Sequence, residues 1–308
     1  MDVKLEAIAS GTYIVAVSGG VDSMALLDLL RRQPGLRLQV AHINHSMRTD
    51  SDLDEQLVAA FCASHNIPYV SKKLHLGQGA SEAAARDERY KYLRYCRDKY
   101  KAQAIITAHH EDDLIETALI AILRGTGWRG LAPFTHTPDV LRPLAGATKQ
   151  ELIDYATAHS LPWREDSTNT DERYLRNYVR HTLVPFLQKR SSEWRADFLR
   201  LIRNQQALRR TIEDELTTKL TACVAVGGTT IALHRYYWIM LPRPEAYELF
   251  QAMCRTHLGH SVVRNLALQA LLFMNTAKPG KRMPLGAVWQ LRAEANQIIV
   301  ESQASMLS

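Results

Sequence analysis

Residues 18–23 read Ser-Gly-Gly-Val-Asp-Ser and follow a short apolar run that begins at Ile14. A run with helical spacing comes directly after them and includes Met24, Leu27 and Leu30. This pattern predicts a strand, a tight turn and a helix, in which backbone N–H groups and hydroxyls converge at the positive end of the helix dipole. Such a turn binds anions, and phosphate is the usual one.

The loop differs from two common phosphate loops, because it matches neither G-x-G-x-x-G nor G-x-x-x-x-G-K-S/T and contains no lysine. It offers the hydroxyls of Ser18 and Ser23, free backbone donors and the carboxylate of Asp22. A carboxylate beside phosphates is explained by a Mg²⁺ ion between them. The alternative is an ordinary glycine turn with a serine N-cap. The stretch resembles the pyrophosphate loop of the ATP pyrophosphatase group, which cleaves ATP to AMP and pyrophosphate and adenylates a substrate.

Two more polar clusters, 42–48 and 109–116, follow apolar runs of strand length. Open α/β sheets place ligands at the carboxyl ends of parallel strands, so we expect both clusters to lie near the loop. Asp113 and Glu116 are three residues apart and share a helix face. We interpret them as ligands of Mg²⁺ and of a substrate amine.

Histidines in these clusters admit two interpretations. His42, His45, His109 and His110 invite a zinc hypothesis, but their spacing is weak metal evidence without cysteine or a clear third ligand. The simpler interpretation is that they donate and accept hydrogen bonds that shape the pocket. We expect His45 and His109 to approach the nucleotide.

Two charged residues also have alternatives. The carboxylate of Asp112 suits a helix N-cap as well as it suits a role in the site. Arg86 has the i,i+4 spacing for a surface pair with Glu82, but its planar guanidinium also suits a carboxylate or a phosphate. The sequence of the helix does not decide between these roles.

The elements that position these residues alternate between strand and helix. The expected strands are at 14–18, 36–43, 67–72 and 104–108, and helices are expected through Met24, Leu27 and Leu30 and at 50–65, 82–100, 112–124 and 149–159. This alternation predicts an α/β fold with an open parallel sheet and helices on both faces.

Residues 171–210 follow with a mostly helical pattern, and they carry ten Lys/Arg against four Asp/Glu. Tyr174, Tyr178 and Trp194 lie between the charges, which suits a phosphate backbone. The alternative is a solvated helix face. Beyond the Gly227-Gly228 turn we expect a small α/β module that supports or grips a large substrate.

Composition and charge indicate the kind of partner and the cellular compartment to expect. The chain has 308 residues and a net charge of +6, which favours a polyanionic partner. The four cysteines never form C-x-x-C, so we expect reduced thiols rather than a disulfide framework. No export signal and no apolar run of membrane-spanning length is visible, so we expect a cytoplasmic protein without membrane contact.

Five blocks together resemble the tRNA(Ile)-lysidine synthetase family. They are SGGVDS (18–23), HINHSMRTDSDLDE (42–55), SEAAARDERYKYL (81–93), TAHHEDDLIETALIAILRGTGWRGL (107–131), and RPL with EDSTNTDERYLRNYVR (142–144 and 165–180). One departure is Ser167, where the family commonly has proline. The chain is short for this family and looks like a compact form with one C-terminal domain.

The resemblance implies an adenine nucleotide α-hydrolase-like fold and a ligase that uses ATP and Mg²⁺. The wobble cytidine of a CAU-anticodon tRNA(Ile) is adenylated at C2, and the ε-amine of free lysine then displaces AMP to leave lysidine. The implied catalytic residues are Asp22, Arg86, Asp113 and Glu116, with Asp22 and Asp113 as Mg²⁺ ligands. The implied ATP-binding residues are Ser18, Gly19, Gly20, Val21, Asp22, Ser23, His45 and His109, and the implied tRNA-binding residues are Arg176, Asn177 and Arg180.

The resulting domain prediction is a catalytic domain at 1–190, a helical linker at 191–226 and a C-terminal tRNA-binding domain at 227–308, with a homodimer as an open question. Three alternatives remain at this point. They are a tRNA thiolase of the same loop group, an RNA-binding protein without catalytic activity, and a small-molecule synthetase of the same fold. Wide cysteine spacing argues against the first, the intact loop together with Asp113 and Glu116 against the second, and the basic helices against the third.

Overall fold

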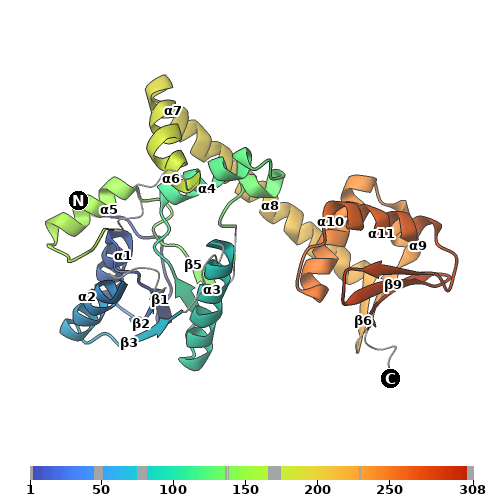
Figure 1. The fold of residues 1–308 in the computed structure, drawn as a ribbon, viewed down its shortest axis with the longest axis horizontal. Coiled ribbons are helices and arrows are strands. Elements are labelled where there is room, and N and C mark those ends of the chain that lie inside the picture. Colours follow the sequence, from blue (N-terminus) through green and yellow to red (C-terminus); the bar gives the residue numbers. More distant parts are fainter. Residues whose placement is uncertain are drawn as a thin grey trace. The chain divides into compact units, whose positions relative to one another are not determined.

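The computed structural model describes residues 3–44, 51–74, 82–135, 137, 139–165, 175–228 and 230–303. The chain divides into two compact units, Met1–Gln206 and Ala207–Ser308. The division falls inside helix α8 (Trp194–Cys223), which fills most of the segment that we expected to be a helical linker (Figure 1). The three predicted domain ranges stay a prediction.

A five-stranded parallel sheet forms the centre of the first unit. Its strands are β1 (Gly11–Ala16), β2 (Leu36–Asn44), β3 (Tyr69–Lys73), β4 (Ala104–Ile106) and β5 (Val140–Leu141), in the order β3-β2-β1-β4-β5. All four strand pairs are parallel. This confirms the predicted sheet, and it puts the carboxyl ends of β1, β2 and β4 at one edge.

The helices of this unit lie close to their predicted ranges. They are α1 (Val21–Arg31), α2 (Ser51–Ser64), α3 (Glu82–Lys99), α4 (Glu111–Leu123), α5 (Lys149–Ala158), α6 (Leu175–Tyr178) and α7 (Val184–Arg190), with a 3-10 turn at Trp128–Leu131 and a π-helix at Val179–Leu183. Much of the basic segment is therefore helical, as its pattern predicts.

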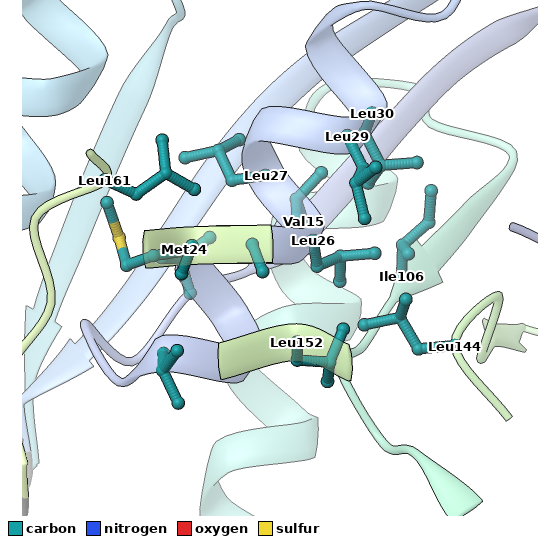
Figure 2. Packing of buried hydrophobic residues seen from close by; sticks show 14 of the residues in the cluster. Val15, Met24, Leu26, Leu27, Leu29, Leu30, Ile106, Leu144, Leu152 and Leu161 are labelled. Atoms are coloured by element: carbon teal, nitrogen blue, oxygen red, sulfur yellow. The ribbon is translucent and has the colours of Figure 1, made fainter. Parts of the chain in front are cut away.

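Alternate residues of β1 reach opposite faces of the sheet, as strand geometry requires. Val15 joins Leu26 of α1 and Leu152 of α5 in one core, which Figure 2 shows together with Leu27, Leu30 and Leu161. Ile14 instead joins Leu93 and Cys96 of α3 on the other face. Helices therefore cover both faces, as predicted.

A third core anchors α4. Ile115 and Ala118 of this helix pack with Val179 of the π-helix and with Leu199 and Ile202 in the first part of α8. This packing brings the basic segment after residue 174 against the helix that carries Asp113 and Glu116.

The second unit contains an antiparallel sheet of order β6-β7-β10-β9-β8. The strands are β6 (Val224–Gly227), β7 (Thr230–His234), β8 (Arg282–Leu285), β9 (Trp289–Ala293) and β10 (Gln297–Ser302), and the helices are α9 (Arg235–Met240), α10 (Arg243–Met253) and α11 (Arg264–Thr276), with a π-helix at Cys254–Leu258. Phe250 is fully buried at its centre, edge-on to Trp238. Sequence patterns did not reveal β6, β8 or α9.

Within the part of the chain that the structure describes, no helix is both long enough and apolar enough to cross a membrane.

Candidate active site

The loop of residues 18–23 is closed by the side chain of its last residue. Ser23 Oγ accepts hydrogen bonds from the backbone N of Ser18 (3.1 Å) and of Gly19 (3.2 Å), and it donates to the carbonyl of Gly20 (2.9 Å). The first intrahelical bond runs from Met24 N to Gly20 O (3.0 Å). The N–H groups before it are those that a helix start leaves for a ligand. Ser23 therefore shapes the loop, and Ser18, which is exposed, is better placed for an anion.

Two distant segments hold the loop in its conformation. Gly19 has φ +94°, and a Cβ there would lie 3.3 Å from Cβ of Asp54 in α2. The carbonyl of Gly19 accepts from the backbone N of Arg164 (3.1 Å), whose Nε donates to Asp54 Oδ1 (2.9 Å). Glycine is required here because both the left-handed backbone and the close approach of α2 exclude a side chain.

Asp22 has a cationic partner that sequence reasoning missed. Lys149, the first residue of α5, donates through Nζ to both carboxylate oxygens, at 2.7 and 2.8 Å. Nε2 of His110 is 3.7 Å from Asp22 Oδ1. Burial alone would raise the pKa of Asp22, but His110 and Lys149 hold it below the usual range. Asp22 is therefore an anion that needs a cation beside it.

His110 lies among three carboxylates. Its Nε2 is 3.5 Å from Asp113 and its Nδ1 is 3.6 Å from Asp112, in addition to the contact with Asp22. Burial opposes the charged imidazole, but these neighbours raise the pKa of His110 to about 10. His110 is thus a buried imidazole whose positively charged form is stabilised by three carboxylates.

Asp22 and Asp113 fit part of a Mg²⁺ site. Both carboxylates face one imidazolium, and oxygen atoms are the ligands that Mg²⁺ prefers. Among the described residues, no group of three or more His, Cys, Asp or Glu side chains could hold a metal ion by itself. Protein Mg²⁺ sites often use one or two carboxylates and take the remaining oxygens from substrate phosphates and water. The pair fits that arrangement.

Glu116 meets residues that we expected to contact tRNA. Arg180 donates to both of its carboxylate oxygens, at 2.6 and 2.9 Å, and Nε of Arg176 is 4.0 Å away. Glu116 is buried at 3% exposure, and Asn177 is also buried. The structure therefore brings Glu116, Arg176 and Arg180 together at the contact between α4 and the π-helix.

Arginines surround His109. Burial, followed by the charges of Arg142, Arg86, Arg89 and Arg176, lowers the pKa of His109 to about 3. The neutral ring accepts or donates at Thr107 Oγ1 (2.9 Å) through Nδ1 and lies 4.9 Å from the ring of Phe134. We name Arg86, Arg89, Arg142 and Arg176 the arginine group. Its charge is high enough to attract an anionic ligand.

Arg86 stacks over the ring of Tyr90 at 5.1 Å, on the same helix. The side chain of Glu82, its alternative partner, lies outside the described residues, as do His45 and residues 166–174.

Asp112 and Arg195 have roles that the sequence left open. Asp112 accepts from the backbone N of Lys149 (2.7 Å), so it caps α5 rather than its own helix. Arg195 of α8 donates to Asp112 (2.8 Å) and to Glu111 (2.9 Å). Burial alone would raise the pKa of Asp112, but His110 and Arg195 hold this pKa far below the usual range. Arg195 thus faces inward, although its charge belongs to the segment expected to bind RNA.

One sequence signal pointed to Lys149. Thr148 and Glu151 form a capping box, in which Glu151 N donates to Thr148 Oγ1 (3.3 Å) and Thr148 N donates to Glu151 Oε2 (2.7 Å). This T-x-x-E pattern predicts that residue 149 begins a helix soon after a strand. Nothing in the sequence indicates that this helix start lies beside Asp22.

Comparisons with known proteins identify the family of this chain. Residues 3–187 match the PP-loop domain family ATP_bind_3. The chain is 30% identical to the tRNA(Ile)-lysidine synthase of Enterococcus faecalis, over 96% of this chain and 67% of that protein. The enzyme of the same name from Bacillus subtilis is 31% identical over 77% of this chain and 53% of its own length, and that from Clostridium tetani is 39% identical over 57% and 40%.

The chain thus spans about two thirds or less of the length of these relatives. Among solved structures, the U34-tRNA thiolase NcsA of Methanococcus maripaludis superposes with a TM-score of 0.55 at 16% identity, over 65% of this chain and 73% of that one. This likeness shows a shared fold. The match over residues 3–187 and the Enterococcus relative, which aligns with 96% of this chain, together show that the chain belongs to the PP-loop domain family, among its tRNA(Ile)-lysidine synthases.

Proposed function

We propose that the protein is an ATP-dependent ligase that converts the wobble cytidine of a CAU-anticodon tRNA(Ile) to lysidine. The observation that carries the proposal is the meeting of three features around α4. They are the loop with its free helix start, the carboxylates Asp22 and Asp113 on one imidazolium, and the arginine group beside His109. The relatives named tRNA(Ile)-lysidine synthase support the substrate.

In the first step, the N–H groups at the start of α1 and the hydroxyl of Ser18 hold the β- and γ-phosphates, which orients the α-phosphorus for in-line attack. The O2 oxygen of the cytidine forms a bond to that phosphorus, and pyrophosphate leaves. Asp22 and Asp113 would hold Mg²⁺, which neutralises phosphate charge when it is bound. The ring of His110, 3.7 Å from Asp22 and 3.5 Å from Asp113, lies between the two carboxylates and offsets their mutual repulsion.

In the second step, the ε-amine of free lysine attacks C2 and AMP leaves. We propose that Arg86, helped by Arg89, Arg142 and Arg176, binds the carboxylate of this lysine, because guanidinium groups bind carboxylates in a bidentate manner.

Asp113 and Glu116 remain our candidates for the lysine amine. Glu116 is paired with Arg180 in this structure, so it must exchange that partner for the ammonium of the substrate.

The tRNA must present an unstacked cytidine, since chemistry on a base requires access to its edge. Arg176, Asn177 and Arg180 are the residues that we propose near that base or its backbone. Because Asn177 is buried, we expect it to act by orienting Arg176 and Arg180. We further propose that the second unit grips the tRNA and that the enzyme is cytoplasmic, while a homodimer stays an untested possibility.

The proposal is tested by incubating the purified protein with ATP, Mg²⁺ and labelled lysine. A CAU-anticodon tRNA(Ile) should acquire the label, and initiator methionine tRNA with the same anticodon should not. Label from cysteine-derived sulfur instead would assign the protein to the thiolases. ATP binding without any labelling would favour an RNA-binding protein without this activity.

For the loop, we expect the Asp22→Ala variant to lose the release of pyrophosphate. Retained release in this variant would contradict a metal-bridging role for Asp22.

A further inference from the structure

We propose that Lys149 is the phosphate-binding lysine that the loop itself lacks, delivered from a helix 127 residues downstream of Asp22. The proposal rests on the use of ATP at this loop, but not on the identity of the RNA substrate. In the free enzyme the ammonium of Lys149 pairs with the carboxylate of Asp22. In the ATP-bound enzyme it contacts the polyphosphate.

The position of the Lys149 backbone is fixed. The capping box of Thr148 and Glu151 defines the start of α5, and Asp112 accepts the backbone N–H of Lys149 at 2.7 Å. Farther along α5, Leu152 belongs to the core shared with α1 (Figure 2). A lysine at this helix start is therefore held beside the loop whether or not its side chain is paired.

The side chain itself keeps freedom to move. It is 42% exposed, and the carboxylate of Asp22 is 29% exposed, so solvent reaches the ion pair. Lysine carries a compact charge on a flexible four-carbon stem, which allows it to change partners within a few ångströms.

Charge balance favours this exchange. Phosphates that bind at the loop would be repelled by Asp22 unless a cation lies between them. The imidazolium of His110 is already shared among Asp22, Asp112 and Asp113. Arg164, also near the loop, is engaged with Asp54. The carboxylate partner of Lys149 is Asp22, which is the residue proposed to bind Mg²⁺. Lys149 is therefore the cation among these that Mg²⁺ would release from its carboxylate.

The alternative is a purely structural ion pair that holds α5 to the loop. The two roles differ in which nucleotide they affect, because AMP lacks the β- and γ-phosphates. We therefore suggest equilibrium binding of the non-hydrolysable α,β-methylene analogue of ATP and of AMP, both with Mg²⁺ and without tRNA or lysine, by calorimetry.

Lys149→Met should weaken binding of the analogue by about tenfold or more, the usual scale for losing a charge-assisted hydrogen bond. Binding of AMP should change less than about twofold, and Lys149→Arg should keep part of the affinity because it keeps the charge.

Lys219→Met is the matched control. Lys219 pairs with Glu245 in the second unit at similar exposure, 35% and 31%, so it loses a comparable ion pair away from the loop. It should bind the analogue like the unmodified protein.

A double-mutant cycle with Asp22→Asn separates a direct role from an indirect one. If Lys149 contacts phosphate, Lys149→Met should still weaken binding of the analogue in the Asp22→Asn background. Three results would overturn the proposal. They are unchanged affinity in Lys149→Met, an equal loss for AMP, and loss of the effect in the Asp22→Asn background.

Discussion

The pair of Glu116 and Arg180 allows a quantitative test of how α4 is joined to the π-helix. We expect Arg180→Met to destabilise the protein, because it leaves the carboxylate of Glu116 buried without its bidentate partner. Removing one partner of a fully buried pair costs about 3–5 kcal/mol. Since Arg180 is 35% exposed, water already screens the pair, and we expect the lower range of about 1–3 kcal/mol.

The measurement is urea unfolding at pH 7, followed by circular dichroism. At this chain length, about 1–3 kcal/mol corresponds to a fall in Tm of roughly 2–12 °C. The variant Glu116→Gln/Arg180→Met should be more stable than Arg180→Met alone, because the buried charge is gone as well. Arg200→Met, which breaks an exposed pair with Asp197, should change the free energy of unfolding by less than about 0.5 kcal/mol.

Strict additivity of the two substitutions would refute the reasoning, since it would mean that Glu116 and Arg180 are not coupled.

The Glu116→Gln substitution also tests whether Glu116 binds the amine of the substrate lysine. If Glu116 binds the substrate amine, Glu116→Gln should raise the KM for lysine by more than it changes the KM for ATP. Equal changes in both KM values would argue that Glu116 only holds the fold.

Three further predictions follow from particular contacts. Gly19→Ala should lower Tm and analogue affinity through the left-handed backbone and the approach of α2, whereas Gly146→Ala, which has open space around it, should do neither. Arg195→Met should lower kcat about tenfold or more, because Asp112 loses the cation that positions it against His110 and Lys149. An unchanged kcat in steady-state assays would exclude this positioning role of Arg195. Asp28 is buried against Tyr155, and although burial opposes it, hydrogen bonds lower its pKa. Its contribution to stability is therefore present above its unfolded pKa and lost as pH falls through the lower folded pKa. Urea unfolding of Asp28→Asn should show a large deficit at pH 7 that shrinks below about pH 4, and a constant deficit would contradict the assignment.

Much of the fold could be predicted because its cause is local. Apolar runs of strand length alternate with helical spacing as far as residue 124, and this alternation predicts strands that run parallel, as the structure shows. Short elements were missed where packing decides the outcome. The strand β8 contains Pro284 in a four-residue run, and it forms because β9 supplies the hydrogen-bonding partner.

The candidate site divides in the same way. Asp22, Asp113 and Glu116 were recognisable from spacing within one loop and one helix. The structure pairs Arg180 with Glu116, 64 residues away in sequence, and its expected contact with RNA stays a prediction. His45 and the block at 166–174 lie outside the described residues, so their predicted roles stay predictions.

A turn suited to phosphate and lacking a lysine could be predicted from residues 18–23 alone, because they are contiguous and their conformational preferences are local. Only the tertiary structure decided which cations stand beside that loop. Lys149 and His110 reach Asp22 through the packing of α5 and α4 against the sheet, and Arg195 reaches Asp112 through α8. Electrostatic partners depend on distance in space rather than on separation along the chain, so no spacing in the sequence could reveal them.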